Sequence, residues 1–399
     1  MEFSRRDRPL GLAPGSVRDW RELARRRLPR QFFDYIDGGA GEELTMGANE
    51  SALASIGIRQ RVLRDVSRRS TATTLFGEDL ALPLVLAPVG LAGVYRRRGE
   101  VQAAKAAAAF GVPFCESTVS ICGVEEVARA SSRPPWFQLY VMKDRAYAAD
   151  LLGRASAAGA RVLLLTVDLP VVGARYRDWR NGLEGGLSPL GKLRKLLDYA
   201  GHPSWAFDVG LLGKPLGFGN LEKAVPGAGD PTAFKAWVDS QFDPSVTWAD
   251  LDWVRDNWKG KILLKGILDP EDAREAARRG MDGIVVSNHG GRQLDGAPAA
   301  ALALPVVAEA LAGVAAPDFV VLADGGVRSG VDILKYLSLG ARACLVGRPW
   351  AWALAARGEA GVRSILSTLK AEMEVAMGLA GLNSVEETGR EVIARQQAG

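Results

Sequence analysis

Eight short apolar segments alternate with alanine-rich amphipathic stretches along this 399-residue chain. The alternation predicts an α/β fold of the (β/α)8 type, the TIM barrel. The rival fold is a doubly wound open sheet, but no GxGxxG motif follows the first expected strand, and eight segments favour closure. The hydrophobic content of 48% and the charged content of 24% are those of an ordinary globular protein.

The expected strands are short runs rich in valine, leucine and isoleucine. In chain order they cover residues 82–88, 113–117, 136–141, 162–167, 262–266, 283–287, 319–323 and 343–346. Helix patterns such as 101–110, 124–130 and 146–158 lie between them. A further helix has clear ends, because Asp269 can cap its start, Pro270 suits its first turn and Gly280 can end it.

A single domain is expected to cover the whole chain, residues 1–399. Residues 1–78 form an N-terminal helical segment in this scheme, 79–356 the barrel and 357–399 the C-terminal helices. The regular spacing breaks once, since roughly ninety residues separate the fourth and fifth expected strands, far more than an ordinary connection needs. The middle of this insertion, about residues 178–231, is rich in glycine and proline, and we expect it to be mobile.

Leucines and basic residues alternate in the insertion, and aromatic residues follow them. The members are Leu190, Lys192, Leu193, Arg194, Lys195, Leu196, Leu197, Trp205, Phe207, Leu211 and Leu212. A basic amphipathic segment with exposed aromatic side chains is typical of helices that lie in a membrane surface. An equally weighted alternative is a lid packed on its own barrel. No spanning segment or secretory signal is predicted, so any membrane contact is expected to be peripheral.

The charge and the cysteines limit the functional classes. The net charge of +4 is a mild, scattered arginine excess that fits solvated helix faces, an anionic lipid surface or an anionic substrate. No nucleic-acid-binding motif occurs. The three cysteines, Cys115, Cys122 and Cys344, are too few for a disulfide framework and fit reduced thiols in a cytosol.

The densest polar motif of the chain runs from Ser287 to Asp295 and directly follows an expected strand. It contains His289, one of only two histidines, together with two glycines and Arg292. Histidine exchanges a proton near neutral pH, glycine lets the backbone approach a ligand, and arginine clamps a carboxylate with two hydrogen bonds. A lone histidine is usually structural, but this combination at a strand end predicts a catalytic site.

Barrel active sites lie at the carboxyl ends of the strands, so the residues found there are the candidates. From the first strand to the eighth they are Pro88, Val89 and Gly90; Ser117; Gln138 and Tyr140; Thr166, Asp168 and Arg175; Lys265; Ser287, His289 and Arg292; Asp324, Gly326 and Arg328; and Gly347 and Arg348. The loops after strands seven and eight predict a phosphate site. A phosphate site beside a polar band, formed by Ser117, Gln138, Thr166 and Lys265, suits flavin mononucleotide (FMN). Lys265 is placed to stabilise negative charge on the reduced ring. No metal ion is expected.

These motifs resemble those of the FMN-dependent L-2-hydroxy-acid dehydrogenase and oxidase family. The resemblance runs from about Asp19 to the carboxyl terminus, and the Ser287–Asp295 signature is its most specific part. The other matching motifs are Leu28-Pro29, Asp34-Tyr35, Trp136–Tyr140 and Gly173–Asp178. Within the family the chain looks most similar to bacterial respiratory, quinone-linked L-lactate dehydrogenases, and less so to mandelate dehydrogenase and glycolate oxidase.

The resemblance implies a role for each candidate. Tyr35, Tyr140, Arg175 and Arg292 would bind the substrate, and His289 would be the catalytic base with Asp168 behind it, assisted by Tyr140 and Arg292. The implied cofactor-binding residues are Pro88, Val89, Gly90, Ser117, Gln138, Thr166, Lys265, Ser287, Asp324, Gly326, Arg328, Gly347 and Arg348. Two positions depart from glycolate oxidases, which carry tryptophan at Val119 and alanine at Gly90. Both residues are smaller than those of glycolate oxidases and enlarge the expected substrate pocket, so the sequence leaves the size of the substrate undecided.

The implied reaction is oxidation of an L-2-hydroxy acid, first of all L-lactate to pyruvate, with FMN passing electrons to a membrane quinone. The resemblance also implies a homo-oligomer, a tetramer, at the cytoplasmic side of the inner membrane or otherwise in the cytoplasm. The alternatives are a mandelate-type dehydrogenase, an oxidase producing hydrogen peroxide, an FMN barrel isomerase and a non-catalytic flavin-binding barrel. The sequence leaves open whether hydrogen leaves carbon as hydride or as a proton.

Overall fold

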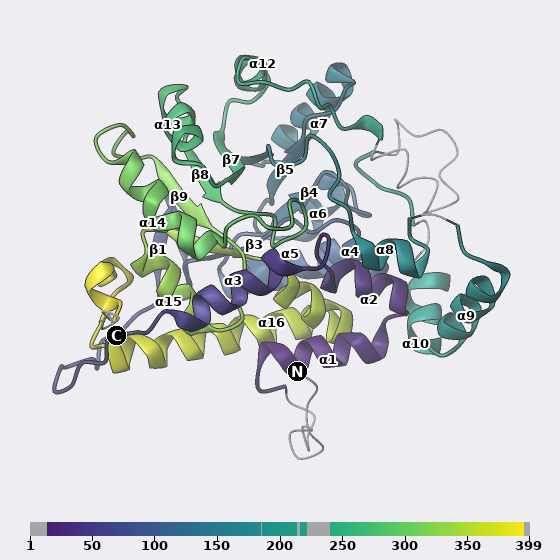
Figure 1. Ribbon diagram of the computed structural model, residues 1–399, viewed down its shortest axis with the longest axis horizontal. Coiled ribbons are helices and arrows are strands. Elements are labelled where there is room, and N and C mark those ends of the chain that lie inside the picture. The colour runs from purple at the N-terminus through teal and green to yellow at the C-terminus, as the bar shows by residue number, and fades with distance from the viewer. Residues whose placement is uncertain (1–13, 185, 214–215, 222–239, 395–399) are drawn as a thin grey trace.

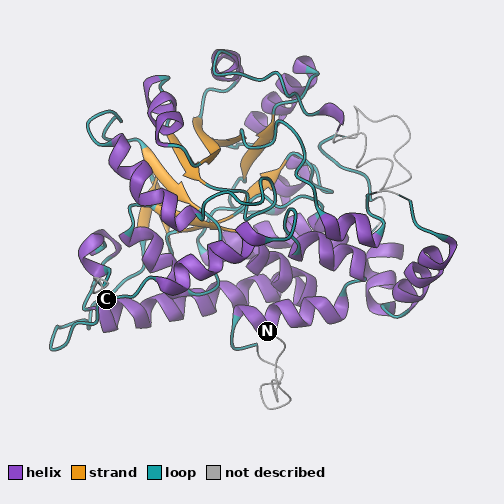
Figure 2. Ribbon diagram, in the orientation of Figure 1, coloured by secondary structure: helices purple, strands orange, loops and turns teal. Residues whose placement is uncertain are grey.

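In the computed structural model, the residues described are 14–184, 186–213, 216–221 and 240–394. Their central element is an eight-stranded parallel sheet with the order β3-β10-β9-β8-β7-β6-β5-β4 (Figure 2). The strands are β3 (Leu84–Leu86), β4 (Cys115–Ser117), β5 (Trp136–Tyr140), β6 (Val162–Thr166), β7 (Lys261–Ile267), β8 (Gly283–Val286), β9 (Val320–Ala323) and β10 (Ala343–Val346). A parallel bridge between Leu86 and Phe114 joins the two edge strands and nearly closes the sheet. The predicted (β/α)8 barrel is therefore confirmed.

Alternating side chains of each strand enter two different cores, because successive residues of a strand point to opposite faces. Leu164 belongs to the cluster inside the barrel, whereas Leu163 and Leu165 pack against the helices outside. An antiparallel hairpin, β1 (Thr73–Leu75) and β2 (Glu78–Leu80), adds Leu75 and Leu80 to the inner cluster. The sequence pattern did not predict this hairpin, which crosses the expected boundary at residue 78.

Helices surround the barrel (Figure 1). Those between and after the strands are α4 (Ala92–Tyr95), α5 (Gly99–Phe110), α6 (Val124–Ala130), α7 (Arg145–Ala157), α12 (Asp250–Asn257), α13 (Pro270–Arg278), α14 (Ala300–Leu311), α15 (Gly330–Ser338) and α16 (Arg348–Ala380), with the 3-10 turns η3 (Val385–Glu387) and η4 (Arg390–Val392) near the end. The predicted cap of α13 is present, since Asp269 accepts a hydrogen bond from the backbone of Glu271 at 2.7 Å. The long α16 changes direction at Arg357 and Gly358, which lie at the expected start of the C-terminal helices.

Three N-terminal helices complete the strand-end side of the barrel: α1 (Val17–Arg27), α2 (Arg30–Asp37) and α3 (Leu44–Ser55). The loop after α2 is bonded to the barrel loops, because Ala40 N–H donates to the Gly291 carbonyl and Gly41 N–H to the Ala174 carbonyl, both at 2.8 Å. The end of α2 therefore lies beside the residues that follow β6 and β8.

The insertion after β6 begins with α8 (Tyr176–Asn181), α9 (Pro189–Ala200), α10 (Pro203–Trp205) and the π-helix η2 (Ala206–Leu211). Figure 1 shows α9 and α10 projecting at the periphery, beyond α2. Part of the stretch that we expected to be mobile, residues 185, 214–215 and 222–231, lies outside the described residues. None of the helices in the described ranges combines the length and the apolar character needed to cross a bilayer.

The insertion has one face that is exposed and another face that packs against the rest of the protein. On α9 the exposed fractions are 56% for Leu190, 52% for Leu193, 65% for Leu196 and 63% for Leu197, and Phe207 is 60% exposed. Trp205 was expected among the exposed aromatic residues, and this prediction is wrong. Its indole is buried against Phe32 and Tyr199, and its N–H donates to the Val94 carbonyl at 2.7 Å.

Candidate active site

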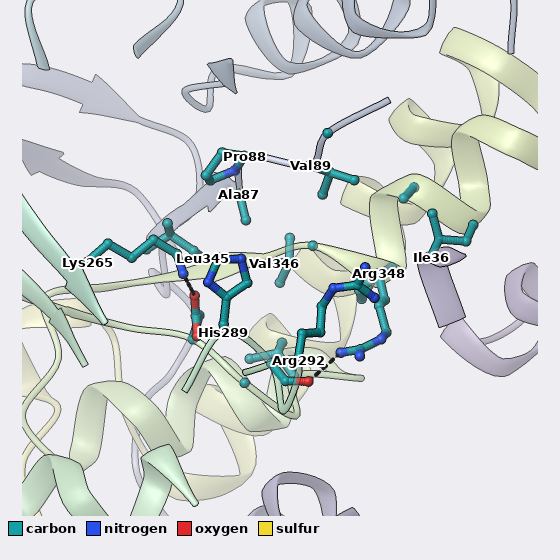
Figure 3. Close-up of a pocket in the computed structure, with 18 of the residues that line it drawn as sticks. Ile36, Ala87, Pro88, Val89, Lys265, His289, Arg292, Leu345, Val346 and Arg348 are labelled. Atoms are coloured by element: carbon teal, nitrogen blue, oxygen red, sulfur yellow. Dashed lines mark hydrogen bonds and ion pairs between the residues drawn. The ribbon is translucent and has the colours of Figure 1, made fainter. Parts of the chain in front are cut away.

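A cavity opens at the carboxyl ends of the strands, and loops from around the barrel line it. The sequence-predicted residues in its wall are Tyr35, Pro88, Val89, Gly90, Tyr140, Thr166, Arg175, Lys265, His289, Arg292, Asp324, Gly326, Arg328, Gly347 and Arg348. Figure 3 shows Lys265 of β7, His289 and Arg292 of the loop after β8, and Arg348 after β10 around the cavity, with Pro88 and Val89 across from them. The strand-end rule therefore brought together residues that lie far apart in the sequence.

Four predicted residues do not line the cavity but support residues that do. The Ser117 hydroxyl donates to the Gln138 side chain at 3.1 Å, and the Gln138 amide donates to the Thr166 hydroxyl at 3.0 Å. The Lys265 ammonium donates to the Ser287 hydroxyl at 3.0 Å. The fourth supporting residue is Asp168, behind His289. A buried polar band thus continues outward from the cavity wall.

His289 and Asp168 form a hydrogen-bonded pair, with 3.0 Å between His289 Nδ1 and Asp168 Oδ1. Burial lowers the pKa of His289 and outweighs the opposing effect of the Asp168 charge. Burial alone would raise the pKa of Asp168, but the charge of His289, its hydrogen bond and the charge of Lys265 leave that pKa below its ordinary value. The pair therefore combines a neutral imidazole with an ionised carboxylate near neutral pH.

The backbone around this pair is unusual. Gly266 has a φ of +113° where the register between β7 and β8 shifts, and a Cβ there would lie 2.5 Å from the Asp168 Cβ. His289 has a φ of +58°, which is uncommon for a residue other than glycine. The Ser287 hydroxyl accepts a hydrogen bond from the His289 N–H at 3.0 Å. These features place Asp168 and turn the imidazole toward the cavity.

One side of the cavity is rich in unneutralised positive charge. Arg175, Arg292 and Arg348 form no ion pair with an acidic side chain of the described residues, and Arg175 Nε is buried without a hydrogen-bond partner there. Burial and the charges of Arg292 and Arg328 lower the pKa of Arg348 to about 9, so the side chain stays charged at neutral pH. A cavity with this composition is suited to anionic ligands.

The loops after β9 and β10 fit a phosphorylated cofactor. Gly326 has a φ of +79°, and a Cβ there would lie 2.4 Å from the Asn49 carbonyl oxygen, so no side chain fits. Arg328 and Arg348 supply positive charge beside these glycines, and the buried Asp324 Oδ1 has no partner among the described residues. The glycine backbone and the two arginines suit the phosphate of FMN, and the Asp324 oxygen suits a ribityl hydroxyl. The polar band with Thr166 suits the edge of the flavin ring.

The search for polar strand-end residues missed part of the cavity wall. The lining residues that were not predicted as site residues are Ile36, Ala87, Tyr95, Val119, Gly290, Gly325, Val327, Leu345, Val346, Pro349 and Ala351. Tyr95 is the most distinctive, since its buried hydroxyl donates to the Gly90 carbonyl at 3.2 Å. Its position in α4 gave no signal in the sequence, because a tyrosine in an apolar helix resembles a core residue.

The two departures from the glycolate oxidase pattern share one wall of the cavity. A Cβ built on Gly90 would lie 2.6 Å from Val119 Cγ2. Val119 therefore packs directly over the space left by the missing side chain of Gly90. The size of this wall depends on both residues together.

A family model described as FMN-dependent dehydrogenase matches residues 24–395. The chain belongs to this family. It is 55% identical over 383 residues to an L-lactate dehydrogenase of Caulobacter sp. (strain K31), covering 95% of this chain and 98% of the relative. It is 53% identical over 380 residues to an L-lactate dehydrogenase of Xanthomonas campestris pv. campestris (strain B100), covering 94% and 96%.

Solved structures agree with the family. The monotopic membrane protein (S)-mandelate dehydrogenase superposes with a TM-score of 0.88 at 35% identity, covering 96% of this chain and 100% of that one. A mandelate oxidase superposes with a TM-score of 0.78 at 39% identity, covering 94% and 97%. The chain is thus an FMN-dependent oxidoreductase, its cofactor is FMN, and the isomerase and non-catalytic alternatives are set aside.

Proposed function

We propose that this protein oxidises L-lactate to pyruvate. The observation that carries the proposal is the His289–Asp168 pair in the same cavity as Arg175 and Arg292, which offers a base beside a carboxylate clamp. The relatives named L-lactate dehydrogenase support lactate as the substrate.

Arg175 and Arg292 bind the substrate carboxylate in this proposal. Their guanidinium carbons lie 5.8 Å and 5.0 Å from the centre of the Tyr35 ring, so both cations pack near the same aromatic residue. Tyr35 and Tyr140 contact the carboxylate and hydroxyl region. Tyr140 stays protonated as a hydrogen-bond donor, since burial raises its pKa.

His289 is the general base. Its Nδ1 is engaged by Asp168, so Nε2 remains as the acceptor for the substrate hydroxyl proton. The ionised Asp168 fixes this tautomer and stabilises the imidazolium that forms, as the carboxylate of a hydrolase triad does. FMN, when bound, would take up the two electrons together with the hydrogen of the substrate carbon, so that this hydrogen and the hydroxyl proton on His289 account for both hydrogens lost.

Cofactor binding is assigned to the strand-end residues. Lys265, between Asp324 at 3.3 Å and Ser287, supplies a positive charge beside the flavin ring, together with Pro88, Val89, Gly90, Ser117, Gln138 and Thr166. Its charge persists because Asp324 and Asp168 outweigh the lowering of its pKa by burial. The ribityl and phosphate groups are assigned to Asp324, Gly326, Arg328, Gly347 and Arg348.

We also propose that electrons pass from FMN to a membrane quinone, and that α9 attaches the protein to the membrane. Support comes from the exposed leucines of α9 beside Lys192, Arg194 and Lys195, and from the similarity to a monotopic membrane protein. The location proposed is peripheral, on the cytoplasmic side of the inner membrane, for a single-domain chain that assembles as a tetramer. Light scattering of the detergent-free protein tests the tetramer.

The second candidate is a mandelate-type dehydrogenase or oxidase, favoured by the small residues Gly90 and Val119 in the cavity wall and by the solved mandelate enzymes. The deciding experiment compares L-lactate and L-mandelate as reductants, then a short-chain quinone and oxygen as oxidants. We expect L-lactate and the quinone to give the higher kcat/KM. Faster turnover with L-mandelate would replace lactate by mandelate as the substrate. Stoichiometric hydrogen peroxide at the lactate turnover rate would replace the quinone by oxygen as the electron acceptor.

A further inference from the structure

The C-terminal end of α2 holds two arginines of the cavity through backbone oxygens. Arg292 Nη1 donates to the Tyr35 carbonyl at 2.7 Å and to the Gly38 carbonyl at 2.8 Å. Arg348 Nη2 donates to the same Gly38 carbonyl at 2.8 Å, and Arg348 Nε to the Asp37 carbonyl at 3.2 Å. The last carbonyls of a helix have no partner within the helix, so they are free to accept these bonds.

This arrangement orients the arginines without neutralising them. The carbonyl end of a helix carries only a partial negative charge, roughly half an elementary charge. A carboxylate in the same place would compete with anionic ligands for the guanidinium groups. The carbonyls of α2 therefore fix Arg292 and Arg348 and leave their charge available, but only while the end of α2 itself stays in place.

Asp37, the last residue of α2, fixes the position of that end through ion pairs. Its side chain is only 2% exposed and accepts hydrogen bonds from Arg21 Nε at 2.5 Å, Arg21 Nη2 at 2.7 Å and Arg177 Nη1 at 2.8 Å. Arg177 also donates to Glu43 at 2.5 Å, and Glu43 accepts from the Gly39 N–H at 3.0 Å. The Asp37 carboxylate thus joins α1, α2 and the segment after β6, and it is not among the residues that line the cavity.

We propose that Asp37 is a positioning residue that keeps the carbonyls at the end of α2 within hydrogen-bonding distance of Arg292 and Arg348. The cofactor side of this inference rests on the FMN site, and the substrate side rests on the proposed function. Because Gly38 serves both arginines, loosening Asp37 should weaken both halves of the site together. Burial would raise the pKa of Asp37, but its two arginine partners hold it below the ordinary value, so the carboxylate is charged at neutral pH.

The test is Asp37→Asn in the FMN-loaded protein, with two readouts. One is the rate at which FMN leaves on dilution, followed by flavin fluorescence. The other is the dissociation constant of oxalate, a carboxylate that is not oxidised, followed by the change in flavin absorbance. Small displacements of positioning groups have large effects, so we expect both the release rate and the dissociation constant to rise about tenfold.

Asp282→Asn is the matched control. Asp282 also binds two basic residues, Lys261 at 2.8 Å and Arg255 at 3.0 Å, but it lies before β8, at the opposite end of the barrel. We expect its variant to lose thermal stability while keeping wild-type FMN release and oxalate binding. If the two variants lose similar stability and Asp37→Asn keeps both readouts within twofold of the wild type, Asp37 is only a structural ion pair and the inference is wrong.

Arg177→Gln gives a milder variant that keeps the Arg21–Asp37 pair, and it decides the matter if Asp37→Asn does not fold. Both readouts should then change in the same direction by a smaller factor, and no change in either would overturn the inference. FMN release involves no substrate. If L-lactate fails to reduce the wild-type protein, the proposed function is refuted. If FMN nevertheless leaves the Asp37 variant faster, the cofactor half of this inference still holds.

Discussion

The strand-end cavity and the insertion after β6 place polar and apolar groups in opposite ways. In the cavity, charged side chains are buried, and Lys265 among them pairs with Asp324 and donates to the Ser287 hydroxyl. On α9, leucines that could form a core are more than half exposed. Burying a charge is costly unless the charge is paired and hydrogen-bonded, and exposing a row of leucines is unfavourable unless something apolar covers it. The cavity therefore has the composition of a ligand site, and the exposed leucines of α9 are the basis of the membrane attachment proposed above.

The two regions are nevertheless joined. Asp198 of α9 accepts a hydrogen bond from the Arg30 N–H at 2.7 Å, and the Tyr199 hydroxyl donates to Gln31 at 2.5 Å. Asp208 pairs with Arg27 at 3.0 Å and with Arg96 at 3.2 Å. Because the attached face of the insertion carries these contacts, substitutions on the exposed face should separate attachment from chemistry. Deleting the whole segment would disturb both.

The largest effect should come from His289→Gln. Loss of a general base costs about two to four orders of magnitude in rate, so reduction of FMN by substrate should fall by that factor. FMN should remain bound, and partitioning to membranes should not change. Stopped-flow absorbance of the flavin measures the rate, and a variant reduced at a near-normal rate would remove His289 from its role.

The next effect concerns α9. Burying a leucine side chain gains about 1.5–3 kcal/mol, so the combined Leu193→Gln, Leu196→Gln and Leu197→Gln variant should bind anionic vesicles at least about 100-fold more weakly. Reduction of FMN by L-lactate should be unchanged, whereas reduction of vesicle-embedded quinone should fall. Leu302→Gln with Val306→Gln, on the exposed face of α14, is the matched control and should bind vesicles normally. Equal vesicle binding by all three proteins would make the insertion a lid.

Arg292→Lys should have a smaller effect, confined to the cavity. Lysine keeps the charge but cannot make the planar pair of hydrogen bonds, and bonds to charged groups contribute about 1.5–3 kcal/mol each. The value of kcat/KM for L-lactate should fall by roughly ten- to a hundredfold while membrane binding stays the same. Steady-state kinetics with a soluble dye measures this, and unchanged kinetics would show that Arg292 does not touch the substrate.

The smallest effect is the pH dependence of the unmodified protein. The base must be neutral to accept a proton, so kcat/KM should fall as the pH drops through the pKa of His289. Burial lowers that pKa, and the acid limb should therefore lie below the range of an ordinary histidine. Membrane binding through the leucines of α9 should not change over the pH range in which kcat/KM falls. An acid limb at or above the ordinary range would mean that the Asp168 charge dominates over burial.

The sequence predicted those features that depend on local pattern. Buried strands such as β6 are continuous apolar runs, and glycines and arginines at their ends mark the phosphate loops. Other features depend on contacts between distant segments. The three-residue strands β1 and β2 are too short for a period, and the burial of Trp205 depends on Phe32 and Val94. The backbone carbonyls of Tyr35, Asp37 and Gly38, which hold Arg292 and Arg348 at the end of α2, have no side-chain signature at all.

Anaerobic mixing with L-lactate tests the central claim most directly, that the strand-end cavity oxidises this substrate independently of the exposed face of α9. The flavin absorbance of the wild-type protein and of the three-leucine α9 variant is followed in the same experiment. Our account predicts complete bleaching of both at the same rate, with no bleaching by D-lactate. Flavin that stays oxidised in the wild-type protein, or that is reduced markedly more slowly in the α9 variant, would contradict it.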